Sequence, residues 1–183
     1  MFIQTQQTPN PNALKFLPGK KVSNSGSYEI IKKENTNNDL IRNILSINGV
    51  TGVFLGEDFI SINKENNIDW EDIKHIAISL INEFYKAGNE FVIDKNINEK
   101  AIDSNFLDIE KKIIKILEDK VKPAVARDGG DIKFKEFKNG IVKVQLQGSC
   151  SGCPSSTMTL KQGVQNVLSH YIPDVKEVIA IQE

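Results

Sequence analysis

The sequence has few of the features that mark membrane or secreted proteins. No apolar run approaches the ~20 residues that a helix needs to cross a bilayer. The opening residues, MFIQTQQTPNPN, carry neither the basic start nor the apolar core of a signal peptide. With 183 residues, 39% hydrophobic and 26% charged, the chain is long enough for one large domain or two small ones. We therefore expect a cytoplasmic protein that does not bind membranes.

Arginine is also scarce. Of the 23 basic residues only Arg42 and Arg127 are arginine, and the formal net charge is -1. Proteins that cover nucleic-acid phosphates need clustered excess lysine and arginine, and arginine is the side chain that most often reads base edges. The composition therefore argues against a nucleic-acid partner.

Signs of an enzyme are lacking as well. The chain has two histidines, His75 and His170, and neither belongs to a recognisable Ser/His/Asp arrangement. The carboxylates show no pairing typical of a general acid and base. The segment DGGD at residues 128–131 lacks the Gly-Lys-Ser/Thr of a phosphate loop, so a turn is the better interpretation. We expect no catalytic residues.

Cysteine is nearly absent, and the two cysteines present carry most of the chemical information. Cys150 and Cys153 stand in the segment GSCSGCPSS. A two-residue spacer lets both sulfur atoms converge on one metal centre or on each other. Three chemistries fit such a pair: thiol–disulfide exchange, a structural zinc site and an iron–sulfur cluster. The spacing alone leaves all three open.

The first part of the sequence indicates a small mixed α/β domain. Residues 13–17 read as a short strand, and residues 53–55 and 59–62 as the arms of a hairpin. Two helices are expected from apolar residues at helical spacing. Their predicted buried residues are Leu40, Ile41, Ile44 and Leu45 in the first, which ends at Gly49, and Ile73, Ala77, Leu80 and Phe84 in the second, which follows Asp69.

The second part is predicted to run in the order helix, strand, strand, helix, strand. Pro123 is expected to interrupt or bend the first helix. The hairpin turns at Asn139 and Gly140, a pair that tolerates the positive φ angles of a tight turn. The residues that define these elements are Ile109, Ile113, Ile116, Leu117 and Val121, then Ile132 and Phe134, then Ile141 or Val142 with Val144 and Leu146, then Leu160, Val164, Val167, Leu168 and Tyr171, and finally residues 175–181.

Together these elements predict an α+β protein built from two small mixed α/β domains. We place the first domain at residues 1–90, a connector without steady periodicity at 91–107, and the second domain at 108–183. The Cys-x-x-Cys loop falls before the second helix of the C-terminal domain. Pro154 indicates the start of that helix, whose free N–H groups and dipole are expected to lower the thiol pKa.

The number of sulfur ligands limits what the cysteine pair can hold. Zinc sites and iron–sulfur clusters take about four protein ligands, and this chain offers two thiols. His75 and His170 are more typical of surface or half-buried positions on helices. A symmetric dimer would place four thiolates around one [4Fe-4S] cluster. Zinc bridging two chains is the structural alternative.

A thiol–disulfide oxidoreductase is the enzymatic alternative. In redox modules of the thioredoxin type the first cysteine begins a helix within a βαβ pattern. Here a predicted hairpin precedes Cys150, and Pro154 follows Cys153. The order of elements therefore disfavours this alternative without removing it.

Two long segments resemble iron–sulfur proteins of the Nfu and NifU type. Residues 121–181, with PAVARDGGDIKF, GIVKVQLQGSCSGCPSSTMTLKQGV and PDVKEV, resemble the C-terminal domain of NifU. TPNPNALKFLPG, INGVTGVFLGEDFISINK and the helix containing Trp70 resemble the N-terminal domain of Nfu proteins. Departures from the family pattern at NNDLIRNIL and at His75 lie in the first part only.

The resemblance implies an iron–sulfur cluster scaffold or carrier rather than an enzyme. Cys150 and Cys153 match the family's cluster-binding pair. It also implies a [4Fe-4S] cluster shared between two subunits, and hence a homodimer when the cluster is loaded. The expected partners are apo iron–sulfur client proteins, which would take the cluster by thiolate exchange, and upstream cluster-assembly proteins.

Overall fold

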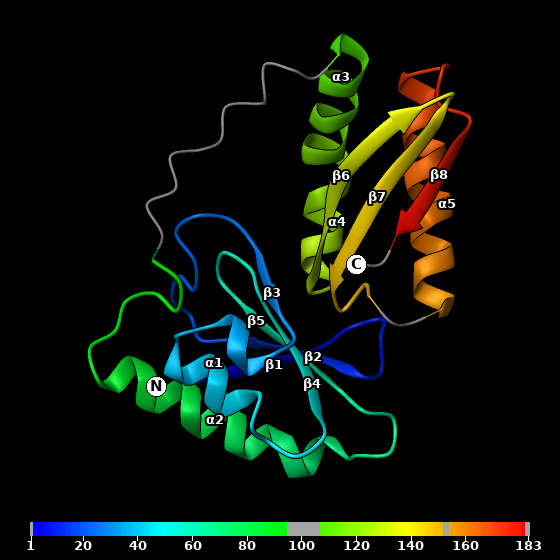
Figure 1. Ribbon diagram of the computed structural model, residues 1–183. Coiled ribbons are helices and arrows are strands. Elements are labelled where there is room, and N and C mark those ends of the chain that lie inside the picture. Colours follow the sequence, from blue (N-terminus) through cyan, green and yellow to red (C-terminus); the bar gives the residue numbers. More distant parts are fainter. Residues whose placement is uncertain (1, 95–106, 152–153, 182–183) are drawn as a thin grey trace.

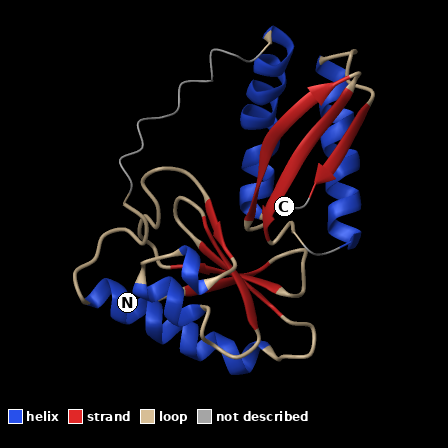
Figure 2. Cartoon of the chain, viewed as in Figure 1, coloured by secondary structure: helices blue, strands red, loops and turns tan. Residues whose placement is uncertain are grey.

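Two β-sheets, each with helices on one face, follow one another along the chain (Figure 1). The computed structural model describes residues 2–94, 107–151 and 154–181. In both parts the strands form one layer and the helices a second, as Figure 2 shows. This construction confirms the predicted fold class. Among these residues no helix is long and apolar enough to span a membrane.

The first sheet is antiparallel throughout, with strand order β1-β2-β5-β4-β3. Its elements are β1 (Gln4–Gln7), β2 (Ala13–Leu17), β3 (Tyr28–Ile30), a 3-10 turn (Lys33–Asn35), α1 (Asp39–Ile44), β4 (Val50–Leu55), β5 (Ile60–Lys64) and α2 (Trp70–Lys86). The predicted strand, hairpin and two helices are all present. β1 and β3 were not predicted, because QTQQ and YEI are too short or too polar to show an alternation.

Helices α1 and α2 cover one face of the first sheet and build the first hydrophobic core (Figure 1). The predicted buried residues of α1 are confirmed, although the helix ends at Ile44, earlier than Gly49. In α2 the predicted burial of Ile73 and Ala77 is confirmed, whereas Leu80 and Phe84 are only partly buried. The next two buried positions are Ile81 and Tyr85, each one residue later than predicted.

The helix-free face of the first sheet is also covered. Strand alternation directs Lys15, Phe54 and Ser61 away from the first core, and all three are buried. Glu29 of β3 and Asn63 of β5 alternate onto the same face. A buried face without helices needs another layer against it, and the C-terminal part of the chain supplies that layer.

The second sheet has the order β6-β7-β8. β6 (Gly130–Lys138) and β7 (Ile141–Gly148) are antiparallel, and β8 (Glu177–Ile181) joins β7 in parallel after α5 (Pro154–Tyr171). The predicted hairpin turn is confirmed, since φ is 52° at Asn139 and 81° at Gly140. Residues buried between this sheet and its helices include Ile132, Val142, Val144, Val164 and Leu168.

A continuous helical run precedes β6, so Pro123, predicted to interrupt or bend the helix, does not interrupt it. It consists of α3 (Asp108–Ile116), the π-helical segment η2 (Leu117–Val121) and α4 (Lys122–Arg127). Within it the N–H of Lys122 donates to the carbonyl of Leu117, five residues earlier. Pro123 has no N–H to donate, and the wider π-helical turn before it lets the helix continue.

The limits of the first packed unit differ slightly from the predicted boundary at residue 90. Val92 is buried in the first core, and Ile93 forms an isolated bridge with Ser23. Most of the predicted connector, residues 95–106, lies outside the described residues. The domain limits therefore stay a prediction.

Candidate functional site

The cysteine loop lies between β7 and α5, as the sequence predicted. β7 ends at Gly148 and α5 begins at Pro154, which confirms the predicted helix start. Cys150 occupies the described part of this loop, and Cys153 lies outside the described residues. What the structure shows of the thiol pair therefore concerns Cys150.

The Cys150 side chain is buried beneath the start of β6. The residue is 7% exposed and packs with the second hydrophobic core. Gly130 lies directly against it, because a Cβ added there would stand 2.7 Å from Cys150 Sγ and 2.5 Å from the carbonyl oxygen of Gln147. A glycine at the first position of β6 therefore makes room for the thiol.

Burial raises the pKa of the Cys150 thiol to about 11. The nearby Ser149 hydroxyl opposes this rise, whereas the charges of Asp128 and Asp131 add to it. The predicted lowering of the thiol pKa is therefore wrong for Cys150. Its sulfur is removed from water, and α5 begins only at Pro154, four positions further along the chain.

A cavity of about 460 Å³ lies beside the thiol. Ser149 and Cys150 border it from the loop, Leu160 and Gly163 from α5, and Pro9 from the first part of the chain. This volume falls in the range of roughly 300–1,000 Å³ that small-ligand pockets occupy. Both parts of the chain thus contribute to the space next to Cys150.

Two asparagines of the first part bind the backbone of the cysteine loop. Asn10 Nδ2 donates to the carbonyl oxygens of Ser149, at 3.0 Å, and Ser151, at 3.4 Å. Asn63 Nδ2 donates to the carbonyl oxygen of Gly148 at 3.1 Å. Asn10 is only 4% exposed, so its side-chain amide forms its hydrogen bonds within the protein and not with water. These contacts fix the loop on both sides of Cys150.

Glu29 completes this set from β3. Its Oε1 accepts the N–H of Gly148 at 2.9 Å and the hydroxyl of Ser151 at 3.4 Å. Burial raises the pKa of the Glu29 carboxyl, while the two hydrogen bonds and the charge of Lys133 act in the opposite direction. The first part of the chain thus contacts the loop with both donors and an acceptor.

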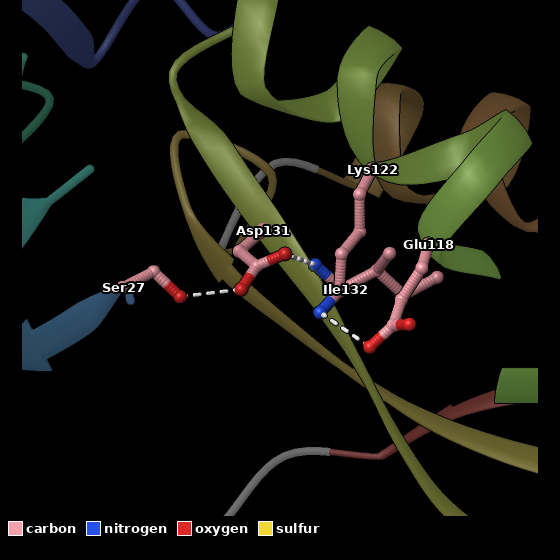
Figure 3. Close-up of polar contacts among 5 residues, drawn as sticks. All are labelled: Ser27, Glu118, Lys122, Asp131 and Ile132. Atoms are coloured by element: carbon pink, nitrogen blue, oxygen red, sulfur yellow. Dashed lines mark hydrogen bonds and ion pairs between the residues drawn. The ribbon is translucent and has the colours of Figure 1, made fainter. Parts of the chain in front are cut away.

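A further polar contact joins the two parts at the start of β6 (Figure 3). The Ser27 hydroxyl donates to one carboxylate oxygen of Asp131, and the other accepts the N–H of Ile132 at 2.8 Å. Beside it, Lys122 Nζ lies 3.9 Å from Glu118 Oε1. The contact places Ser27, the residue before β3, next to β6, the strand that covers the thiol.

Lys15 contributes a cation to the interface. Its Nζ donates to the carbonyl oxygens of Ala126, at 3.1 Å, and Arg127, at 3.4 Å, in the last turn of α4. A cation is favourable at the C-terminal end of a helix. The ammonium group also lies 4.2 Å from the ring centroid of Phe59. Burial lowers the pKa of Lys15, opposed by the charges of Asp58 and Asp128.

Sequence reasoning did not identify the residues that hold the loop. Asn10 belongs to the segment TPNPNALKFLPG, which resembles Nfu proteins, but nothing in that segment indicates that Asn10 binds another part of the chain. The better signal was the pair Phe54 and Phe59, since apolar residues on a helix-free sheet face indicate a second covering layer.

The histidines lie on the surface, as predicted. His170 is exposed near the end of α5, about 24 Å from Pro154 at 1.5 Å per residue. The His75 side chain is 79% exposed on α2 and stands 3.6 Å from Glu71 Oε2. Across residues 2–94, 107–151 and 154–181, no three or more His, Cys, Asp and Glu side chains are grouped to hold a metal ion.

Comparison with known proteins gives matches to both parts of the chain. Residues 3–88 match the family described as "Scaffold protein Nfu/NifU N terminal", and residues 113–179 match the NifU-like domain. The human protein "NFU1 iron-sulfur cluster scaffold homolog, mitochondrial" is 40% identical over 185 residues, which cover 100% of this chain and 73% of that protein. The chain belongs to the Nfu/NifU family.

A plant protein and a solved structure are also similar to this chain. "NifU-like protein 4, mitochondrial" of Arabidopsis thaliana is 40% identical over 184 residues, which cover 97% of this chain and 65% of that protein. The chain thus spans 65% and 73% of the length of these two relatives. The solution structure of a NifU-like protein from Saccharomyces cerevisiae has 35% identity and a TM-score of 0.48, covering 52% of this chain and 86% of that one. The match to the human protein confirms the resemblance found in the sequence at the level of the family.

Proposed function

We propose that this chain is an iron–sulfur cluster scaffold or carrier. In this proposal Cys150 and Cys153 of two subunits hold one [4Fe-4S] cluster as cargo, and the cluster passes to apo-proteins. The observation that carries the proposal is the position of the two cysteines. They are the chain's only cysteines, and they lie inside the segment that matches the NifU-like domain. Cys150 stands on the loop that precedes α5. Two named relatives, human and plant, are an iron–sulfur scaffold homologue and a NifU-like protein.

The count of ligands supports a cargo shared between subunits. A [4Fe-4S] cluster takes four thiolates, and each chain has two cysteines. The described residues show no cluster of other metal-ligating side chains, and both histidines are on the surface. A twofold dimer would supply four equivalent thiolates. The cavity beside Cys150 offers space on the side of the loop that α5 also borders.

Transfer by thiolate exchange fits a site with two ligands per chain. An acceptor thiol loses its proton and forms an iron–sulfur bond, one bond to Cys150 or Cys153 breaks, and the released thiolate takes up a proton. No electrons change hands in this exchange. The client proteins and the upstream assembly proteins are the partners that the exchange requires, and neither enzymatic turnover nor a nucleic-acid or membrane partner enters the proposal.

Iron and sulfide loading of cysteine variants tests the proposal. The parent, Cys150→Ala and Cys153→Ala proteins are loaded anaerobically, and iron, sulfide and visible absorption are measured for each. We expect four iron atoms per two chains in the parent and loss of the cluster in each cysteine variant. His75→Ala and His170→Ala are matched controls and should load like the parent. A cluster retained without Cys150 would contradict the proposal.

The two alternatives make different predictions. A thiol–disulfide oxidoreductase needs a nucleophilic cysteine of low pKa, whereas burial raises the pKa of the Cys150 thiol to about 11. It would show reduction of insulin that depends on Cys150. A zinc-bridged interaction module would contain zinc and no visible absorption. A cytoplasmic location stays a prediction, and the word mitochondrial in the relatives' names describes those proteins.

A further inference from the structure

We propose that the helix-free face of the first sheet is an intramolecular cap on the cysteine loop, and that the cap must release before Cys150 can take part in cluster binding. We call the surface formed by Asn10, Glu29, Phe54 and Asn63 the cap surface. The consequence for cluster loading rests on the function proposed above, whereas the cap itself is a contact within one chain.

The cap surface binds the loop through its backbone. The carbonyl groups of Gly148, Ser149 and Ser151 each accept a hydrogen bond from Asn10 or Asn63. The N–H of Gly148 donates to Glu29. Backbone contacts of this kind fix the path of the loop and leave the Cys150 side chain where the backbone points it, into the second core.

The loop is also held sterically between β6 and the first sheet. A Cβ added to Gly148, where φ is 68°, would stand 2.6 Å from the carbonyl oxygen of Gly129 and 2.9 Å from Phe54 Cγ. The Phe54 ring therefore packs closely against Gly148, the residue at which the loop begins. Along this backbone path Cys150 is 7% exposed and packs against Gly130.

Cluster binding and capping therefore exclude each other. A thiolate that binds iron shared with a second subunit has to leave the core, which moves the loop and breaks its bonds to the cap surface. By linkage, a cap that opposes loading is itself weakened by loading, to the same degree. The cap surface thus acts as a competitor for the loop within the same chain.

The interface between the cap surface and the cysteine loop is polar and incompletely hydrogen-bonded, as expected of a contact that can open. Ser61 Oγ, which faces Gly129, and Asn63 Oδ1, which belongs to the cap surface, are buried without a hydrogen-bond partner in the described part of the chain. Unsatisfied buried oxygens weaken an interface. Polar contacts between parts of one chain commonly permit relative motion. The cap is therefore stable enough to form and weak enough to release.

Alkylation of Cys150 in the apo protein tests the cap without any cluster. In a full-length Cys153→Ser background Cys150 is the single thiol, and its rate of reaction with iodoacetamide is followed by mass spectrometry. Asn10→Ala and Asn63→Ala remove donors from the cap surface. We expect each to speed alkylation at least about fivefold, the factor that one net hydrogen bond represents, and the pair together to speed it further.

Two controls separate release of the cap from general destabilisation. Asn43→Ala changes an exposed asparagine on α1 and should leave the rate unchanged. Ile62→Val trims the first core away from the interface, and it should lower thermal stability without speeding alkylation. Equal alkylation rates in the parent and both cap variants, at unchanged thermal stability, would overturn the proposal.

Cluster loading supplies the second measurement. With both cysteines intact, the Asn10→Ala and Asn63→Ala proteins should load iron faster than the parent. Faster alkylation with an unchanged loading rate would refute the regulatory consequence. If no variant, the parent included, binds iron and sulfide, the proposed function fails, and the alkylation rates still decide whether the cap exists.

Discussion

Gly130 is the residue on which the burial of Cys150 depends most directly. A Cβ at this position meets a backbone oxygen at 2.5 Å and the Cys150 sulfur at 2.7 Å, both far inside normal contact. We expect Gly130→Ala to lower the free energy of unfolding by about 1–3 kcal/mol, as overpacking of a core does. Thermal or denaturant unfolding checks this expectation.

Gly163 is the matched control for Gly130. It lies in α5, and an added Cβ would meet no atom within 4 Å. Gly163→Ala should raise the free energy of unfolding by about 0.5–1 kcal/mol, because alanine is the better helix former. Equal effects of the two substitutions would contradict the packing account of the thiol.

Titration of Tyr85 should make the free energy of unfolding depend on pH in the alkaline range. Burial raises the pKa of its phenol to about 12, and its hydroxyl donates to the Lys21 carbonyl at 3.2 Å. Because the folded pKa lies above that of the unfolded chain, near 10, folding keeps the proton bound. The contribution of the Tyr85 phenol to the free energy of unfolding is complete below pH 10 and is lost as the pH rises toward 12.

Comparison with Tyr85→Phe isolates this effect from the titration of lysines. The variant should be less stable by about 1 kcal/mol at neutral pH, having lost one hydrogen bond. Between pH 10 and about 12 the parent should lose more stability than the variant. Parallel curves over this interval would show that Tyr85 does not titrate as described.

At the residue level the sequence predicted which side chains form the site but not their surroundings. Their rarity and spacing were enough to choose Cys150 and Cys153. The burial of Cys150 depends on Gly130 of β6, which pairs with Gly148 across the hairpin. A local pattern carries no information on which strand covers a loop, and so the direction of the pKa shift was predicted wrongly.

Among secondary-structure elements, those with long periodic patterns were predictable. α1, α2, α5 and the hairpin β6–β7 all appear where apolar periodicity and turn residues indicated. β1 and β3 were missed because an edge strand is defined by its neighbour rather than by its own residues. The π-helical turn η2 was missed because helical periodicity does not show how a helix adapts to a proline.

The β6–β7 turn provides a prediction at this scale. Gly140 has φ 81°, and a Cβ there would stand 3.0 Å from the carbonyl oxygen of Asp174. We expect Gly140→Ala to cost about 1–2 kcal/mol of unfolding free energy, the strain of a left-handed conformation. Asn139→Gly, which relaxes the neighbouring positive φ, should cost far less. Denaturant unfolding of both variants checks the difference.

For the whole molecule, the interface between the two sheets could not be predicted from the sequence. Asn10 and Ser149, which it brings together, are 139 positions apart. The family resemblance predicted what each part is like, and it was confirmed by the matches to residues 3–88 and 113–179. It did not predict that one part would cover the cysteine loop of the other.

Lys15 tests the interface at this scale. Its ammonium group binds the last carbonyls of α4 and contacts the Phe59 ring. We expect Lys15→Ala to lower the free energy of unfolding by about 1.5–3 kcal/mol, the value of hydrogen bonds to a charged group. Lys32→Ala, at an exposed position, should change it by no more than about 0.5 kcal/mol. Similar losses in the two variants would argue against an anchoring role.

The native mass of the anaerobically loaded protein tests the central claim most directly. Each 20.5 kDa chain has two cysteines. The predicted species contains two chains, four iron atoms and four sulfides, since one [4Fe-4S] cluster needs about four thiolates. A single chain that carries the full complement of iron and sulfide, with no outside thiol bound, would contradict the account.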